Sequence, residues 1–359
     1  MADNDSQQPQ APEFITLGSK YLTLAQNLEA MQRHPVLIFG SSAAGKTQLI
    51  ISLIQCLQRS GIVDVTLGEP IFDKADPRSA GVHQVAESLY RRSSYDADLG
   101  RAIAATQTVE PFFVPLDVQP RDSHHMSVKL ALMDSRGEEY APNADQNQSF
   151  LKPLASEIQE LLQTFSHGIS VIYVAPYSVG SGHDRDTASS NHGLLGVLDA
   201  YRKDRSMRDR DAHLFLLTKW DQYAPPMNQK RLFENPWPVD VDHVLRERYD
   251  RSWGEFQSLP LDGKAGHRRA FMQYTAGHFI NGARSRPPEL FASTYDRYSR
   301  TLMNWLYGNA TLLDVSGQGQ DLNIRGILFD EVLPEKVPRL SVSERAASIL
   351  LKGSVRRPR

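Results

Sequence analysis

One octapeptide constrains this chain more than any other feature: Gly40-Ser41-Ser42-Ala43-Ala44-Gly45-Lys46-Thr47. It matches the phosphate-loop pattern G-x-x-x-x-G-K-[ST] in full, and it stands between an apolar run at residues 36–39 and a helix-like segment at 46–58. Small residues let backbone N–H groups surround a phosphate at a helix N-terminus, while Lys46 places a cation against the phosphate oxygens and Thr47 offers a hydroxyl to Mg²⁺. The octapeptide therefore predicts a site for a nucleotide's phosphates.

Short apolar runs recur along the chain, separated by helix-like stretches, at residues 112–116, 128–133, 169–175, 213–217 and 271–274. Alternation of buried strands with helices predicts an α/β fold in three layers, a mostly parallel sheet with helices on both faces. Helical patterns fit that arrangement at residues 17–32, 80–91, 241–253 and 288–307. We therefore expect the three-layer fold of P-loop NTPases.

The composition argues against several other classes of protein. The 359 residues carry 40 Lys and Arg against 42 Asp and Glu, so no overall positive field favours nucleic acid. Every apolar run is far shorter than the ~20 residues of a membrane-spanning helix, and residues 1–14 lack the features of a signal peptide. The single cysteine, Cys56, excludes an internal disulfide and is expected in the core. We expect a cytoplasmic protein without a transmembrane segment or a nucleic-acid partner.

A second motif, Asp134-Ser135-Arg136-Gly137, follows the predicted strand at residues 128–133 and fits D-x-x-G. An acid at the end of a strand can hold Mg²⁺ through water, so Asp134 is a candidate metal residue together with Thr47. Chance supplies D-x-x-G often. Its weight here comes from lying on the second apolar strand after the phosphate loop.

A third motif, Thr218-Lys219-Trp220-Asp221, directly follows the predicted strand at residues 213–217. It resembles the guanine-recognition sequence [NT]-K-x-D. A carboxylate at Asp221 can accept hydrogen bonds from guanine N1–H and the 2-amino group, whereas adenine has an unprotonated N1 there. Lys219 would lay its aliphatic stem along the base, and Thr218 keeps a hydroxyl where Asn is commoner.

In this order, the three motifs resemble those of P-loop GTPases of the Ras-like and translation-factor-like superclass. The resemblance covers roughly residues 36–277. It implies that the chain binds GTP and GDP with Mg²⁺ and hydrolyses GTP. It also implies a nucleotide-controlled switch acting on a protein partner or through self-assembly.

The resemblance assigns roles to further residues. Gly137 would present its N–H to the γ-phosphate, and Glu138 stands where Ras-like members carry a water-orienting Gln. Thr108 occupies the place of the mobile switch threonine that senses the γ-phosphate through Mg²⁺, with Thr106 as a competitor. Thr275-Ala276 stands where the superclass has a Ser-Ala-Lys-like turn that reaches guanine O6, although Gly277 replaces the lysine.

The organisation around these motifs is less regular. We expect a disordered arm at residues 1–14, a GTPase domain at 15–310 with insertions at about 60–105 and 222–268, and a C-terminal extension at 311–359 with a short helix near 341–352. The second insertion is expected to form a small lid or subdomain beside the nucleotide. The mixed charges of residues 202–211 suggest a solvated helix end. Such insertions are similar to those of bacterial GTPases encoded beside partner proteins.

Two other functions remain open. In a P-loop ATPase or kinase, the match at residues 218–221 would be accidental, but an ATPase with an additional strand commonly carries a catalytic Glu directly after the Walker-B acid. Ser135 occupies that position here. The second alternative is a scaffold that binds GTP and barely hydrolyses it. Identifying the nucleotide that the purified protein carries would separate these hypotheses.

Overall fold

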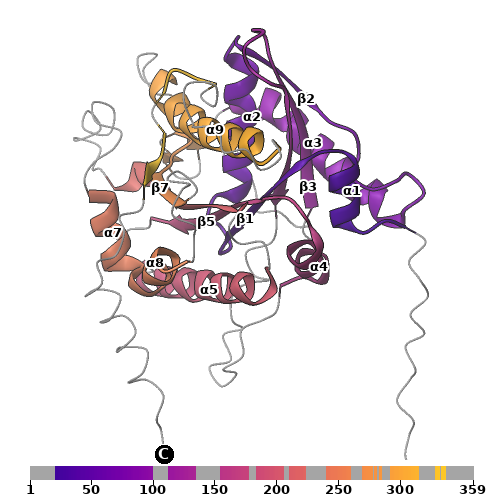
Figure 1. The fold of residues 1–359 in the computed structure, drawn as a ribbon. Coiled ribbons are helices and arrows are strands. Elements are labelled where there is room, and N and C mark those ends of the chain that lie inside the picture. Colours follow the sequence, from indigo (N-terminus) through magenta and orange to yellow (C-terminus); the bar gives the residue numbers. More distant parts are fainter. Residues whose placement is uncertain are drawn as a thin grey trace, which may run out of the picture.

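An eight-stranded sheet forms the centre of the protein (Figure 1). The computed structural model describes residues 21–99, 112–134, 154–177, 183–205, 210–223, 240–259, 269–277, 279–280, 283–284, 292–314, 328–331 and 333–336. The strands, in chain order, are β1 (His34–Gly40), β2 (Val63–Leu67), β3 (Phe112–Pro120), β4 (Val128–Asp134), β5 (Ser170–Pro176), β6 (Ala212–Thr218), β7 (Arg269–Gln273) and β10 (Glu335–Lys336). Their spatial order is β10-β7-β6-β5-β1-β4-β3-β2. A separate pair, β8 (Phe279–Ile280) and β9 (Ala283–Arg284), is antiparallel.

The sheet confirms the expected mixed α/β architecture with a mostly parallel core. Strand β1 is parallel to both β4 and β5, and β5, β6 and β7 continue in the same direction. Strands β3, β2 and β10 run antiparallel to their neighbours. Strand β2 was not predicted. Its buried Val63 and Val65 alternate with exposed Asp64 and Thr66, the period of an edge strand.

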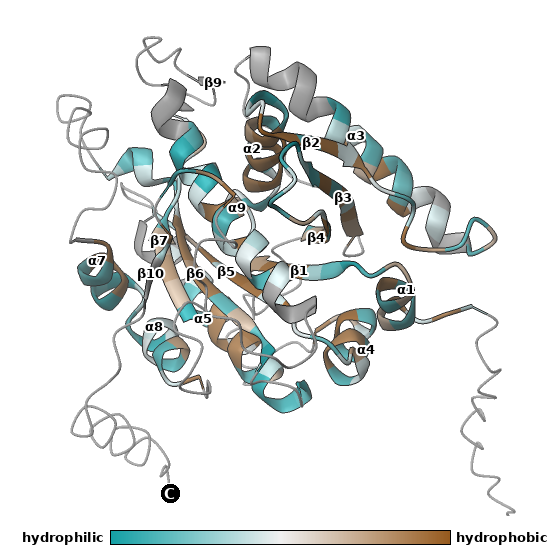
Figure 2. Cartoon of the chain, turned by 45° about the horizontal axis from the view of Figure 1, so that its top comes forward, coloured by the Kyte–Doolittle hydropathy of each residue, from teal (hydrophilic) through white to brown (hydrophobic). Residues whose placement is uncertain are grey.

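Helices cover both faces of the sheet, which gives three layers. One face carries α2 (Lys46–Arg59), α3 (Pro77–Leu99) and α9 (Ala292–Asp314); the other carries α1 (Leu24–Ala30), α4 (Ser156–Thr164), α5 (His183–Asp204), α7 (Asp240–Arg248) and α8 (Asp250–Gln257). The apolar side chains of β1 alternate between the two faces of the sheet. Val36 and Ile38 pack with α2, and Leu37 and Phe39 pack on the opposite face. Figure 2 accordingly shows hydrophobic residues along the central strands. Cys56 is buried in α2 as expected, and burial raises the pKa of its thiol to about 12.

Several predicted helices differ in extent from the observed ones. The helix predicted at 241–253 is two helices, because the chain breaks at Tyr249, whose hydroxyl donates to the Pro176 carbonyl. The helix predicted to end near residue 307 continues to Asp314, past Gly308. Beyond α9, residues 328–329 are held by Asn304, and β10 pairs with β7. The C-terminal stretch therefore contributes to the main sheet. No helix in the described ranges has the length and hydropathy of a membrane span.

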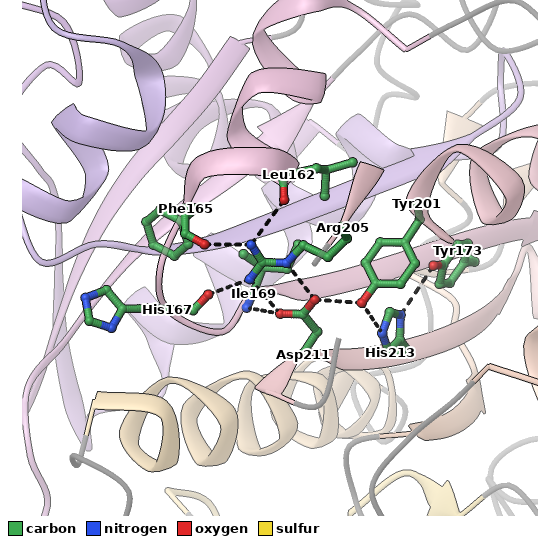
Figure 3. Close-up of polar contacts among 9 residues, drawn as sticks. All are labelled: Leu162, Phe165, His167, Ile169, Tyr173, Tyr201, Arg205, Asp211 and His213. Carbon is green, nitrogen blue, oxygen red and sulfur yellow. Dashed lines mark hydrogen bonds and ion pairs between the residues drawn. The ribbon is translucent and has the colours of Figure 1, made fainter. Parts of the chain in front are cut away.

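The expectation of a solvated helix end at residues 202–211 is correct only in part: α5 ends at Asp204, and Lys203 and Arg210 are exposed, but Arg205 and Asp211 are buried. The side chains of Arg205 and Asp211 are 0% exposed and form a bidentate ion pair at 2.8 and 2.9 Å (Figure 3). The same guanidinium donates to three carbonyls in the last turn of α4 and just after it, those of Leu162, Phe165 and His167. The helix sequence alone could not reveal this, because the carbonyl partners lie about forty residues earlier.

Candidate functional site

The described motif residues converge on one edge of the sheet, the carboxyl ends of the parallel strands. The phosphate loop follows β1, Asp134 ends β4, Thr218 ends β6, and Thr275 follows β7. Ligands of open α/β sheets bind at this edge because loops and helix N-termini meet there. The structure therefore brings together residues separated by more than 200 positions in the sequence.

The phosphate loop has the backbone geometry of an anion cradle. Ala43 and Gly45 adopt left-handed conformations, with φ of 58° and 93°, and α2 begins at Lys46. Such turns direct successive N–H groups toward one point in front of a helix N-terminus. Gly40 is required by packing, since a Cβ there would lie 2.7 Å from the Val174 carbonyl oxygen. Of the loop side chains, Ser42 is exposed and Ala44 is buried.

The ammonium group of Lys46 is hydrogen-bonded to the first residues of the phosphate loop. Lys46 is 5% exposed, and its Nζ donates to the carbonyls of Gly40 at 2.9 Å and Ser41 at 3.0 Å. These contacts hold the ammonium at the start of the loop. A phosphate bound by the N–H groups would meet this charge directly.

Two candidate metal residues are in direct contact. The Thr47 hydroxyl donates to Asp134 Oδ2 at 2.6 Å, although 87 residues separate them. Asp134 is fully buried, and β4 places it beside β1 because the two strands are neighbours. A hydroxyl from the first turn of α2 and a carboxylate at the end of β4 are oxygen ligands of the kind that Mg²⁺ takes. The residues present therefore fit the ion that the motifs imply.

The third motif forms a tight turn against the phosphate loop. The Thr218 hydroxyl donates to the Ala44 carbonyl at 2.6 Å, so this residue links β6 to the loop. Lys219 then adopts a left-handed conformation with φ of 56°, and Trp220–Gln222 forms one turn of 3-10 helix. Asp221 is 4% exposed, and its Oδ1 accepts from the Thr275 hydroxyl at 3.1 Å. The two predicted base-binding segments, residues 218–221 and 275–276, thus meet.

The turn after β7 is closed by its own threonine. The single proton of the Thr275 hydroxyl is shared between Asp221 Oδ1 and the Gly277 carbonyl, which lies closer at 2.6 Å, and Ala276 is half-buried. Four further predicted residues, Thr106, Thr108, Gly137 and Glu138, lie outside the described residues.

Sequence reasoning missed two residues that contact the motifs. Ser190 of α5 is 1% exposed, and its hydroxyl lies 2.6 Å from the Ser41 hydroxyl of the phosphate loop. Tyr177, which follows β5, donates its N–H to the Thr218 carbonyl at 2.8 Å. Neither residue belongs to a recognisable pattern, so only the tertiary structure identifies them.

Comparisons with known proteins give a distant likeness. No protein-family model matches the chain, and no curated protein matches it. Among solved structures, it is similar to the S. cerevisiae Ski7 GTPase-like domain bound to GDP and inorganic phosphate, with 11% identity and a TM-score of 0.29 over 76% of this chain and 52% of that one. For the same domain bound to GTP, the identity is 12% and the TM-score is 0.28, over 74% of this chain and 50% of that one. The chain spans about half the length of these structures.

Proposed function

We propose that this protein binds guanine nucleotides with Mg²⁺ and hydrolyses GTP, acting as a nucleotide-controlled switch for a protein partner. One observation carries the proposal. The Thr47–Asp134 contact, the Lys46 ammonium and the Asp221 carboxylate lie at the same sheet edge, joined by the Thr218 hydrogen bond to Ala44. A phosphate cradle coupled to a buried acid after β6 suits a ligand that has both phosphates and a base.

The preference for guanine rests on Asp221. Its carboxylate only accepts hydrogen bonds, so it complements the N1–H and 2-amino donors of guanine and leaves adenine without a matching donor at N1. The Thr275 hydroxyl bond at 3.1 Å uses one oxygen and helps to orient the group. Burial strengthens the preference, because a buried carboxylate that faced the unprotonated N1 of adenine would meet a lone pair in place of a donor.

The residues of the phosphate loop would bind the phosphates. Lys46 would bind the β and γ oxygens, and the loop N–H groups would bind the β-phosphate. Mg²⁺, when bound, neutralises charge that develops on the phosphate oxygens, and Thr47 with Asp134 would hold it. As part of the proposal, Gly137 contacts the γ-phosphate, Thr108 senses it, and Glu138 orients the attacking water. Glu138 accepts but cannot donate a hydrogen bond, so we expect the isolated protein to hydrolyse GTP slowly.

The base preference is tested by competition against a fluorescent GDP on the full chain. We expect GTP and GDP to displace it at concentrations at least about 100-fold lower than ATP, since a buried carboxylate is involved. Asp221→Asn is expected to weaken the binding of GDP and to strengthen that of xanthosine diphosphate, because an amide can donate to the 2-oxo group of xanthine. Equal displacement by ATP would instead support a P-loop ATPase or kinase.

Hydrolysis is measured on the same preparation as phosphate release across a wide range of protein concentrations. A rate that rises with concentration, or on adding a partner, supports a switch completed by assembly. Guanine binding with no measurable release under any of these conditions would identify a GTP-binding scaffold.

A further inference from the structure

Three aromatic side chains pack against one another at the turn that carries Asp221. The aromatic cluster consists of Tyr177, Trp220 and Tyr223. Trp220 stacks on Tyr223, with ring centroids 4.2 Å apart and planes inclined by 10°, and the Tyr177 ring meets both edge-on at 5.9 and 5.4 Å. Because Trp220 and Tyr223 flank Asp221 in the chain, their packing determines where the backbone of this turn lies.

Backbone hydrogen bonds also connect the turn to the residues that follow β5 and β7. The backbone N–H of Tyr177 donates to the Thr218 carbonyl at 2.8 Å, and the backbone N–H of Trp220 donates to the Tyr274 carbonyl at 3.3 Å. Between these contacts, Lys219 keeps its left-handed conformation. Residues other than glycine hold such a conformation only where the surrounding contacts over-determine it. Here these contacts include the two backbone hydrogen bonds on either side of Lys219 and the ring packing of the neighbouring Trp220.

Helix α7 holds the cluster from outside the motifs. The Arg248 guanidinium lies 4.2 Å from the centroid of the Tyr177 ring, and its Nη2 donates to the Tyr177 hydroxyl at 3.1 Å. The next residue, Tyr249, donates its hydroxyl to the Pro176 carbonyl at 2.7 Å. Two consecutive residues at the end of α7 therefore hold the two residues that support the base turn.

We propose that Arg248 acts through Tyr177 as a positioning residue that aligns Asp221 and so sets the selectivity of the site for guanine over hypoxanthine. This inference rests on the proposed function. Guanine and hypoxanthine share N1–H and O6 and differ only in the 2-amino group. A carboxylate must lie in the plane of the base to accept from both N1–H and the 2-amino group, so a displaced turn loses the second bond first.

The test compares dissociation constants for GDP and IDP on the full chain. The wild type should prefer GDP by about 10- to 100-fold, the range of one hydrogen bond to a charged group. Arg248→Ala should reduce that preference by about three- to tenfold, and Tyr177→Phe, which removes only the hydroxyl, by about threefold. Arg248→Lys should recover part of the preference, since it keeps the charge but not the planar stack.

The matched control is Arg246→Ala on the same helix. Arg246 is 47% exposed and pairs only with Asp242 among the ion pairs described, at 2.7 Å, so the GDP-to-IDP preference should stay within about twofold of wild type. Competition by inorganic tripolyphosphate, which has no base, should not change in any variant. If Arg248→Ala fails to fold, Tyr177→Phe and Arg248→Lys carry the test.

The outcomes separate this inference from the proposed function. An unchanged GDP-to-IDP preference in the Arg248 and Tyr177 variants would overturn the positioning role. So would a uniform loss of GDP, IDP and tripolyphosphate binding, because that indicates general damage. A wild-type protein that binds no guanine nucleotide would overturn the proposed function, and the positioning role with it.

Discussion

Residues that are distant in the sequence meet at the carboxyl edge of the sheet through single short contacts. Thr47 and Asp134 meet because β1 and β4 are neighbours, and the hydroxyl donates to the carboxylate at 2.6 Å. Each is a group that Mg²⁺ accepts as a ligand. The affinity for nucleotide should therefore depend on this pair only when the metal is present.

We expect Thr47→Ala to weaken GDP binding by about 10- to 100-fold in Mg²⁺, since a hydroxyl beside a charged group is lost. In excess EDTA, the variant and wild type should bind GDP within about threefold of each other, because the metal no longer distinguishes them. Titration calorimetry in both buffers measures this. Thr66→Ala, at an exposed position on β2, is the control and should behave as wild type. An equal loss in both buffers would show that Thr47 does not act through Mg²⁺.

At the scale of elements, the Arg205–Asp211 pair joins α4, α5, β5 and β6 at the amino ends of the strands (Figure 3). Besides Arg205, Asp211 accepts from the Ile169 N–H at 3.0 Å and the Tyr201 hydroxyl at 2.6 Å. Every lone pair of the buried carboxylate thus has a donor nearby. Breaking a buried pair leaves an uncompensated charge, which costs far more than the pair contributes.

Asp211→Asn should therefore lower the free energy of unfolding by about 3–5 kcal/mol, because the Arg205 charge stays buried without its partner. Urea unfolding followed by circular dichroism measures the change. Asp64→Asn is the matched control: its Arg121 pair is more than half exposed, so the unfolding midpoint should barely move. GDP affinity of folded Asp211→Asn should be unchanged, since the network lies at the other end of the sheet. A stable Asp211→Asn protein would contradict this assignment.

At the scale of the whole molecule, two buried histidines make stability depend on pH. Burial lowers the pKa of both His34 and His213 to about 3, from the ordinary value of 6.5. The neutral ring of His213 is satisfied on both nitrogens, between the hydroxyls of Tyr201 and Tyr173. His34 Nε2 lies 2.8 Å from the Ser170 hydroxyl. Both rings therefore resist protonation in the folded state.

The unfolded chain binds protons at these histidines below pH 6.5, whereas the folded chain does not until about pH 3. Their contribution to the free energy of unfolding is thus complete above pH 6.5. It falls as the pH drops below this value, by about 1.4 kcal/mol per pH unit for each histidine. Chemical unfolding at pH 7 and pH 5 measures the difference. His213→Gln should be less stable at pH 7 and lose less stability between the two values. The carboxyls of Asp64 and Asp122, whose pKa values are lowered, titrate below this window. A flat profile from pH 7 to 5 would contradict the prediction.

The positions of the central strands and of the phosphate-loop helix were readable from the sequence. Apolar runs and motif residues are local patterns, and β1, β4, β5, β6 and β7 lie within a few residues of the predicted runs. The mostly parallel order followed from the alternation of strands and helices. By contrast, β2 could not be predicted. Its apolar and polar residues alternate over only five positions, within a stretch that otherwise resembles an insertion.

Tertiary packing decided which polar groups are partners. The charges of residues 202–211 look solvated in the sequence, but Arg205 is buried, because Asp211 and the carbonyls at the end of α4 complete its hydrogen bonds. In the same way, Ser190 contacts the phosphate loop and Arg248 contacts Tyr177 from helices that carry no motif. Periodicity within a short window encodes which face of an element is buried. Which distant donor meets which acceptor depends on how the layers pack, and no local pattern contains that information.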